Sequence, residues 1–162
     1  MTAVHLPDEA ATLALAAKLA RTAPDTAVVY LHGDLGSGKS TLARAWLRTL
    51  GVTGTVRSPT YTLVERYPQA TGGEALHLDL YRIGASGELE YLGLDDSEAA
   101  LWLVEWPDRG AGALPQADLH VHLAISGGGR AARLQPGTAT GQAWLTRLAD
   151  AGDLQRISEP NP

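Results

Sequence analysis

One stretch of the chain, residues 28–47 with the sequence VVYLHGDLGSGKSTLARAWL, constrains the fold more than any other. Four residues separate Gly33 from the run Gly38, Lys39 and Ser40, which is the spacing of the Walker A pattern. The residues just before it are apolar and β-branched, as in a buried central strand, and those after it favour a helix. The stretch therefore predicts a strand, a phosphate-binding loop and a helix in succession.

The residue types of this loop suit a bound phosphate. Glycines let backbone N–H groups converge on phosphate oxygens without a Cβ in the way, and the start of the following helix attracts an anion. We expect Lys39 to reach the β- and γ-phosphates and the Ser40 hydroxyl to bind Mg²⁺. The candidate nucleotide-binding residues in the loop are Gly33, Asp34, Leu35, Gly36, Ser37, Gly38, Lys39, Ser40 and Thr41.

Two carboxylates further along the chain are candidates for the same site. Glu105 ends the apolar run LWLV, and a carboxylate at the carboxyl edge of a core strand can hold Mg²⁺ directly or through water. Asp79 belongs to the polar side of the alternating segment HLDLYR and is a candidate to orient an attacking water. Each of the two could instead be an ordinary exposed residue of a strand.

The segment RSPTYTL, residues 57–63, admits two interpretations. It is either a switch-like loop whose Ser58 and Thr60 hydroxyls sense the γ-phosphate or its metal, or a simple proline turn.

The remaining patterns predict an α/β fold in one domain. The expected elements are helices at 8–20, 39–51, 86–93 and 143–152, strands at 26–32, 75–82 and 99–106, a loop followed by a strand over 52–67, and a hairpin around Gly127, Gly128 and Gly129. The length of 162 residues fits a single domain. We expect that domain to span 1–152, and residues 153–162 to form a flexible C-terminal tail.

The composition disfavours several classes of protein. Apolar residues make up 44% of the chain and no apolar run approaches the roughly 20 residues that span a bilayer, so we expect no membrane association. The N-terminus lacks the pattern of a secretory signal, and the absence of cysteine is compatible with a reducing cytosol, so a cytoplasmic location is expected. The net charge of −5, without a basic cluster, argues against a free-standing RNA-binding protein.

Some histidine and tryptophan residues need separate interpretation. His120 and His122 lie two apart, a spacing compatible with a metal, but no third ligand is evident and a solvated strand face is expected. Trp106, beside Glu105, either lines the nucleotide pocket or packs elsewhere. The tryptophans expected in the core are Trp46, Trp102 and Trp144.

Three classes of nucleotide-binding protein are open to such a chain. A GTPase would need an Asn-Lys-x-Asp segment, which the sequence lacks. A small-molecule kinase normally has an Arg-rich lid, whereas the arginines between 57 and 110 are scattered. A nucleotide-driven accessory protein needs only the loop, a metal, a water-positioning group and a surface for its partner, and the small size favours it. A nucleotide-regulated binding module without required turnover, and a kinase, remain alternatives.

Several motifs, in this order along the chain, resemble those of the TsaE family, the bacterial ATPases of tRNA threonylcarbamoyladenosine biosynthesis. They are LPDEAATLALAAKLA, VYLHGDLGSGKSTLARAWL, VRSPTYTLVERY, LHLDLYRI, ELEYLGLDD and LVEWPDRG. The resemblance covers roughly residues 6–135 and is much more specific than the Walker A pattern alone.

The resemblance implies a fold and an activity. The fold would be a single P-loop NTPase domain of the α/β class, with a central, mainly parallel sheet flanked by helices. Family members bind ATP and ADP with Mg²⁺, hydrolyse ATP slowly on their own and act on the TsaB–TsaD complex. That complex modifies tRNAs that decode ANN codons, so this chain would meet tRNA only indirectly.

The resemblance also implies roles for particular residues. Ser40 takes the place of the Mg²⁺-binding hydroxyl and Thr41 that of the second hydroxyl after the lysine, where many family members have two threonines. Asp79 matches the catalytic aspartate of HxDLYR, and Glu105 the acidic residue of VEW associated with Mg²⁺ and hydrolysis. The implied catalytic residues are Asp79, Glu105 and Thr41, and those implied near the adenine are Glu9 and Thr12.

Overall fold

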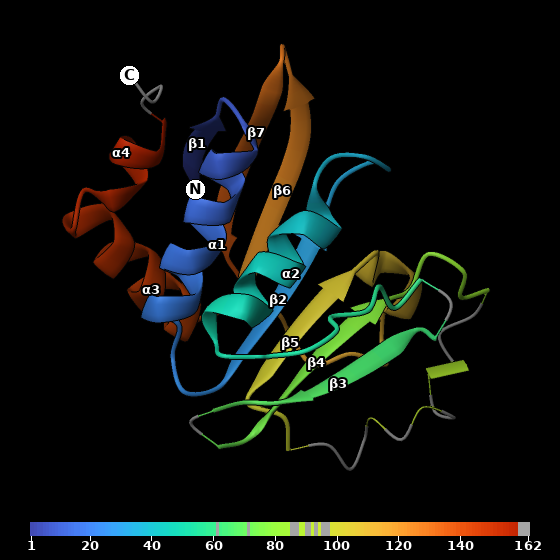
Figure 1. Cartoon of the computed structure of the whole chain (residues 1–162). Coiled ribbons are helices and arrows are strands. Elements are labelled where there is room, and N and C mark those ends of the chain that lie inside the picture. Colours follow the sequence, from blue (N-terminus) through green and yellow to red (C-terminus); the bar gives the residue numbers. More distant parts are fainter. Residues whose placement is uncertain are drawn as a thin grey trace.

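The residues described by this computed structural model are 1–60, 62–70, 72–84, 88–89, 92, 94 and 98–158, and within them seven strands form one sheet (Figure 1). The strand order across the sheet is β1-β7-β6-β2-β5-β4-β3. The strands are β1 Thr2–Leu6, β2 Ala27–His32, β3 Val64–Pro68, β4 Glu74–Asp79, β5 Leu101–Glu105, β6 Leu119–Ser126 and β7 Gly129–Pro136.

The sheet is parallel at its centre and antiparallel at both edges. The pairs β6–β2, β2–β5 and β5–β4 are parallel, whereas β1–β7, β7–β6 and β4–β3 pair antiparallel. The expectation of a mainly parallel sheet is therefore wrong for the edges. The physical reason is connection length, because a parallel crossover needs about a dozen residues or more. The turn between β6 and β7 has only Gly127 and Gly128, with Ser126 paired to Gly129.

Helices cover one face of the sheet and its β1 edge (Figure 1). The helices are α1 Glu9–Thr22, α2 Lys39–Thr49, α3 Ala139–Asp150 and α4 Asp153–Ser158, with a 3-10 turn η2 at Pro107–Gly110. Asp8 caps α1 by accepting a hydrogen bond from the Ala11 N–H at 2.8 Å. No helix in the described part of the chain has the length and apolar character to cross a membrane.

Hydrophobic clusters lie on both faces of the central strands, which explains why β5 is buried throughout. Leu101 and Leu103 belong to the cluster under α1 and α2, while Trp102 and Val104 belong to the cluster on the opposite face. The tryptophans expected in the core are buried, and the indoles of Trp46 and Trp144 meet edge to face with ring centroids 5.9 Å apart. The predicted strands, the hairpin and the helices beginning near residues 8 and 39 are confirmed.

The C-terminal region differs from its prediction. We expected a flexible tail from residue 153, but α4 begins there, and its Leu154 is buried in the main hydrophobic cluster. The Ser158 hydroxyl accepts a hydrogen bond from the His5 N–H at 3.1 Å, which ties α4 to β1, a strand that the sequence analysis missed. Residues 159–162, and most of the helix expected at 86–93, lie outside the described residues.

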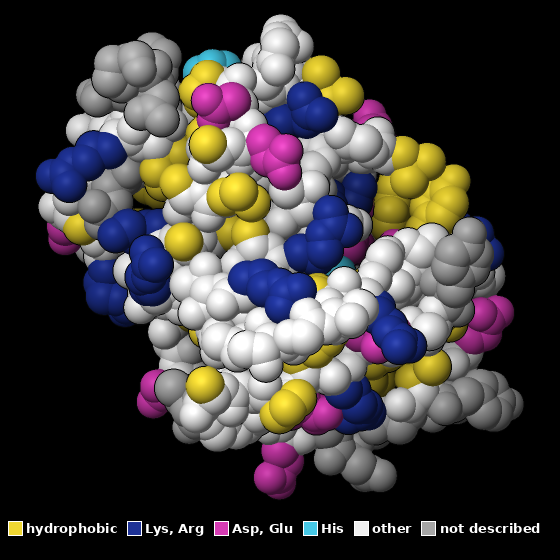
Figure 2. Space-filling model, viewed as in Figure 1, with side chains coloured by type: hydrophobic (Ala, Val, Ile, Leu, Met, Phe, Trp, Pro, Cys, Tyr) yellow, Lys and Arg dark blue, Asp and Glu magenta, His cyan; other side chains and the backbone are white. Residues whose placement is uncertain are grey.

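Charge is distributed unevenly over the surface. Lys and Arg side chains gather across the middle of the face that carries α1 and α2, although the chain as a whole has a net charge of −5 (Figure 2).

Candidate functional site

The loop between β2 and α2 has a backbone that requires glycine at two positions. Gly33 has a φ of +150°, and a Cβ there would lie 2.4 Å from the Leu123 carbonyl oxygen and 2.5 Å from the Ser37 Oγ. Gly38 has a φ of +106° and is the N-cap of α2. The loop therefore turns sharply from the carboxyl end of β2 into the N-terminus of α2, where backbone N–H groups can hold an anion.

Lys39 is the first residue of α2, and its side chain folds back onto the loop. The ammonium group donates hydrogen bonds to the carbonyl oxygens of Gly33 at 2.5 Å and Asp34 at 3.0 Å. It also lies 4.5 Å from the centre of the Trp106 ring. Burial lowers the Lys39 pKa below its usual value, while the charge of Glu105 and of other nearby carboxylates opposes that shift.

Glu105 is the last residue of β5 and has polar partners on two sides. Its carboxylate accepts hydrogen bonds from the Ser40 hydroxyl, with oxygen–oxygen distances of 2.9 and 3.1 Å. On the other side, its Oε2 lies 2.7 Å from Nε2 of His77, which is fully buried. The other ring nitrogen of His77, Nδ1, has no hydrogen-bond partner within the part of the chain that the structure describes. The histidine therefore orients the carboxylate toward Ser40.

Asp79 is the last residue of β4 and lies opposite Glu105 in the parallel register. It is 6% exposed, so the polar side of the segment HLDLYR is buried at this position. Its carboxylate accepts hydrogen bonds from the Tyr81 N–H at 3.0 Å and from the Thr60 hydroxyl at 3.4 Å. Burial raises the pKa of Asp79, and the charge of Glu105 raises it further, while the hydrogen bond from the Tyr81 N–H opposes this.

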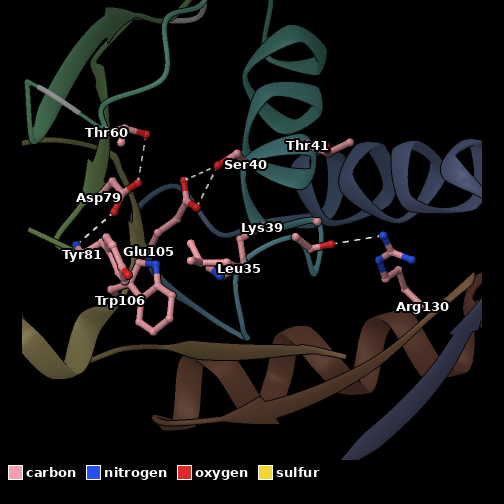
Figure 3. Close-up of a pocket in the computed structure, with 12 residues that line it drawn as sticks. Leu35, Lys39, Ser40, Thr41, Thr60, Asp79, Tyr81, Glu105, Trp106 and Arg130 are labelled. Carbon is pink, nitrogen blue, oxygen red and sulfur yellow. Dashed lines mark hydrogen bonds between the residues drawn. The ribbon is translucent and has the colours of Figure 1, made fainter. Parts of the chain in front are cut away.

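These side chains face one cavity of about 320 Å³ (Figure 3). Its lining residues are Leu35, Gly36, Gly38, Lys39, Ser40, Thr41, Thr60, Asp79, Tyr81, Glu105, Trp106 and Arg130. Most of the residues expected at the site are thus brought together. Tyr81 and Arg130 were not predicted to line the site. The HxDLYR motif contains Tyr81 and could have indicated it, whereas no motif of the sequence analysis contains Arg130.

Five of the predicted residues lie elsewhere. Gly33, Asp34 and Ser37 line a separate cavity on the far side of the loop. Glu9 and Thr12 line an adjoining cavity of about 250 Å³, and Gly38, Thr41 and Arg130 line both this cavity and the main one. The two cavities therefore meet at the loop.

Trp106 has a left-handed backbone, with a φ of +56°, although it is not glycine. Its ring centre lies 5.0 Å from that of Tyr81. Such a conformation costs about 1–3 kcal/mol and is commonly held in place at functional sites. Here it turns the chain after Glu105 so that the indole forms a wall of the cavity.

The loop at 57–63 is anchored at its beginning and contacts the site at Thr60. Tyr67 fixes Arg57 by accepting from its N–H at 3.0 Å and donating to its carbonyl oxygen at 3.2 Å. The hydroxyls of Ser58 and Thr60 lie 2.7 Å apart. Tyr61 lies outside the described residues, and the switch role of this loop stays a prediction.

His120 and His122 are half-buried rather than fully solvated, and His32 joins them. The His32 and His122 rings stack with centres 4.5 Å apart, and His32 Nε2 lies 2.9 Å from His120 Nδ1. Burial, followed by the charges of the two neighbours, lowers the pKa of His32 to about 4. Among the described residues, no group of three His, Cys, Asp or Glu side chains has the geometry to hold a metal ion.

The chemistry of the main cavity suits an anion beside a hard divalent cation. Ser40 and Glu105 offer oxygen atoms that already converge, and Asp79 offers a further carboxylate. Oxygen donors of this kind are those that Mg²⁺ takes in proteins. Lys39 and the N-terminus of α2 supply the positive side.

Comparison with known proteins identifies similar chains. The family model described as "Threonylcarbamoyl adenosine biosynthesis protein TsaE" matches residues 6–132. The tRNA threonylcarbamoyladenosine biosynthesis protein TsaE of Haemophilus influenzae is 42% identical over 126 residues, covering 74% of this chain and 79% of that protein. The protein of the same name from Bacillus subtilis is 36% identical over 123 residues, covering 75% of each chain.

A solved structure is similar over nearly the whole chain. The crystal structure of Bacillus subtilis YdiB superposes with a TM-score of 0.75 and 26% identity, covering 93% of this chain and 95% of that one.

Proposed function

The chain belongs to the TsaE family of tRNA threonylcarbamoyladenosine biosynthesis, and we propose that it serves there as a Mg²⁺-dependent ATPase with a P-loop NTPase fold. One observation carries the proposal. Lys39 and Ser40, from the start of α2, face a single cavity together with Asp79 and Glu105, from the ends of the parallel strands β4 and β5 (Figure 3).

Different residues of the cavity would bind the phosphates and the metal ion. Backbone N–H groups of the loop and the Lys39 ammonium bind the phosphates of ATP or ADP, which replace the carbonyl partners that Lys39 has without nucleotide. Ser40 and Glu105 would hold Mg²⁺, with His77 fixing the orientation of the Glu105 carboxylate. The metal would supply positive charge that offsets charge on the transferred phosphoryl group.

Asp79 is proposed to position the attacking water. Its carboxylate lies in the same cavity and is held by the Tyr81 N–H and the Thr60 hydroxyl. A raised pKa favours a carboxylate that can accept a hydrogen bond from water and take up a proton. Thr60 couples this carboxylate to the loop at 57–63, and Thr41 contributes a second hydroxyl to the cavity wall.

The adjoining cavity is proposed to take the adenine. Glu9 and Thr12 line it, and it joins the phosphate cavity at Gly38 and Thr41. A carboxylate there can accept a hydrogen bond from the exocyclic amino group of adenine.

The proposed partner is the TsaB–TsaD complex, in the cytoplasm. The chain would hydrolyse ATP slowly alone and faster when docked on that complex, and it would meet tRNA only through the complex. The net charge of −5 supports this indirect contact, since RNA binding needs cationic side chains to neutralise phosphates.

Replacing Asp79 tests whether turnover is required. The Asp79→Ala variant should still bind nucleotide and dock on TsaB–TsaD, because Lys39 and Ser40 are intact, but tRNA modification should be lost. Modified nucleoside is measured in a reconstituted reaction, with the exposed Asp150→Ala as the matched control. Modification that survives in Asp79→Ala would favour a nucleotide-regulated binding module. Transfer of labelled phosphate from ATP to a metabolite would instead indicate a kinase.

A further inference from the structure

Arg130 binds the backbone of the phosphate loop from a distant part of the chain. Its Nη2 donates a hydrogen bond to the carbonyl oxygen of Gly36 at 3.1 Å, and its Nε donates to that of Ser37 at 3.2 Å. Its Nη1 donates to the carbonyl oxygen of Gly129 at 2.9 Å. Figure 3 shows the guanidinium beside the loop, on the side away from Asp79 and Glu105.

The hairpin that carries Arg130 is a firm support. In the sheet register, Arg130 pairs with Leu6 of β1 on one side and with Ile125 of β6 on the other. The backbones are so close here that a Cβ on Gly129 would lie 2.3 Å from the Leu6 carbonyl oxygen. Arg130 therefore reaches the loop from a fixed backbone position, and only its side-chain freedom is lost when it binds the loop.

The bond from Arg130 to the Ser37 carbonyl oxygen orients a peptide group that matters for phosphate binding. The bond to Gly36 braces the neighbouring peptide, whose Ser37 N–H donates to the Asp34 carbonyl oxygen at 3.1 Å. The chain has no cis peptide bonds among its described residues, so the C=O and N–H of each peptide point in opposite directions. Holding the Ser37 carbonyl toward Arg130 therefore turns the Gly38 N–H the other way. Hydrogen bonds from a charged donor are about twice as strong as neutral ones, so this orientation is well fixed.

We propose that Arg130 is a positioning residue that keeps the phosphate loop in its anion-binding shape before nucleotide arrives. The inference rests on the proposed function, because it assumes that the loop binds phosphate. It adds a determinant from the β6–β7 hairpin that lies outside the Walker A pattern. Arg130 also lines both the phosphate cavity and the adjoining cavity, so its charge adds to the positive potential where the two meet.

A positioning role and a catalytic role make different predictions. If Arg130 prepares the loop, its loss lowers the affinities for ADP and ATP by similar factors and leaves the rate of hydrolysis at saturating ATP nearly unchanged. If it instead contacts the transferred phosphoryl group, the saturating rate falls while the affinity for ADP is kept.

The test compares Arg130→Met and Arg130→Lys with Arg133→Met, an exposed arginine three residues further along β7. Calorimetry gives the ADP and ATP affinities, and single-turnover hydrolysis gives the saturating rate. Arg130→Met should weaken both nucleotides about 10- to 100-fold with a saturating rate within about twofold. Arg130→Lys should recover part of the nucleotide affinity. Arg133→Met should have the same affinities and saturating rate as the protein without substitutions.

A measurement without nucleotide separates this inference from the proposed function. Amide hydrogen exchange at residues 36–40 should speed up about tenfold in Arg130→Met but not in Arg133→Met. Unchanged loop exchange, unchanged affinities, or a fall confined to the saturating rate would each overturn the positioning role. If the protein without substitutions binds ADP but never hydrolyses ATP, the ATPase proposal is refuted. The hydrogen-exchange rates and ADP affinities of the Arg130 variants would still test the positioning role.

Discussion

Two groups of titratable side chains lie on the parallel strands at the centre of the sheet, and they differ in their partners. The carboxylate cluster on β4 and β5, formed by Asp79 and Glu105, contacts hydroxyl, imidazole and backbone donors. The histidine stack on β2 and β6, formed by His32, His120 and His122, has its closest ring contacts within itself.

The difference shows why a cluster of titratable groups on the central strands is not sufficient for a site. In the carboxylate cluster, different kinds of groups converge around a cavity that is left for a ligand. In the histidine stack, burial and then the charges of neighbouring histidines lower the pKa of His32 and of His120, and the three rings pack against one another. We therefore expect substitutions in the carboxylate cluster to change chemistry, and those in the histidine stack to change stability.

The largest effect is expected from Lys39→Ala. The variant removes the ammonium group from the cavity, so nucleotide affinity should fall by about 100-fold or more, since each charged hydrogen bond contributes about 1.5–3 kcal/mol. Calorimetry with ADP measures this, and Lys18→Ala on α1, outside the cavity, is the matched control. An ADP affinity that is unchanged in Lys39→Ala would contradict the assignment of this loop as the phosphate-binding loop.

Glu105→Ala should have the next largest effect, on hydrolysis rather than on binding. The change leaves the Ser40 hydroxyl and His77 Nε2 without their shared partner, so the metal would lose an oxygen donor. Hydrolysis at saturating Mg²⁺ should fall about 100-fold, with nucleotide affinity changed only a few-fold. Glu74→Ala, which breaks the ion pair with Arg66 away from the cavity, is the control. Intact hydrolysis in Glu105→Ala would contradict its assignment to the metal.

The smallest effect is expected from His32→Gln, and only at low pH. The pKa of His32 is about 4 in the folded protein against an ordinary 6.5, so between these values the unfolded chain binds a proton that the folded protein does not. Stability should therefore fall as the pH drops from 6.5 toward 4. Thermal unfolding should show a shallower fall in His32→Gln, by a few degrees, than in His5→Gln. If His32→Gln leaves the pH dependence of stability unchanged, the structural role assigned to the histidine stack is contradicted.

The sequence predicted the part of the site in which local pattern and chemistry coincide. Gly38, Lys39 and Ser40 could be placed from spacing alone, because strand, loop and helix follow one another directly. Glu105 could be placed because it ends the apolar run LWLV, which the sequence predicts to be a buried strand. These predictions depend on contacts that are close along the chain or imposed by parallel pairing.

The rest depends on contacts between distant residues that carry no local pattern. Arg130 contacts a loop more than ninety residues earlier, and nothing in the residues around it distinguishes it from Arg133. His32 completes a stack with two residues of β6 only because β2 and β6 are neighbours in the sheet. Strand β1, the antiparallel pairing of β3 with β4, and helix α4 were missed for the same reason, since the burial of Leu154 becomes visible only after the sheet is assembled.

The central claim is that this cavity hydrolyses ATP for a partner complex, and phosphate release tests it most directly. The rate is measured for the protein alone and with purified TsaB–TsaD, at saturating Mg²⁺ and ATP. We expect slow phosphate release by the protein alone and a several-fold faster release with the complex. Tight nucleotide binding with no change in rate on adding the complex would contradict it.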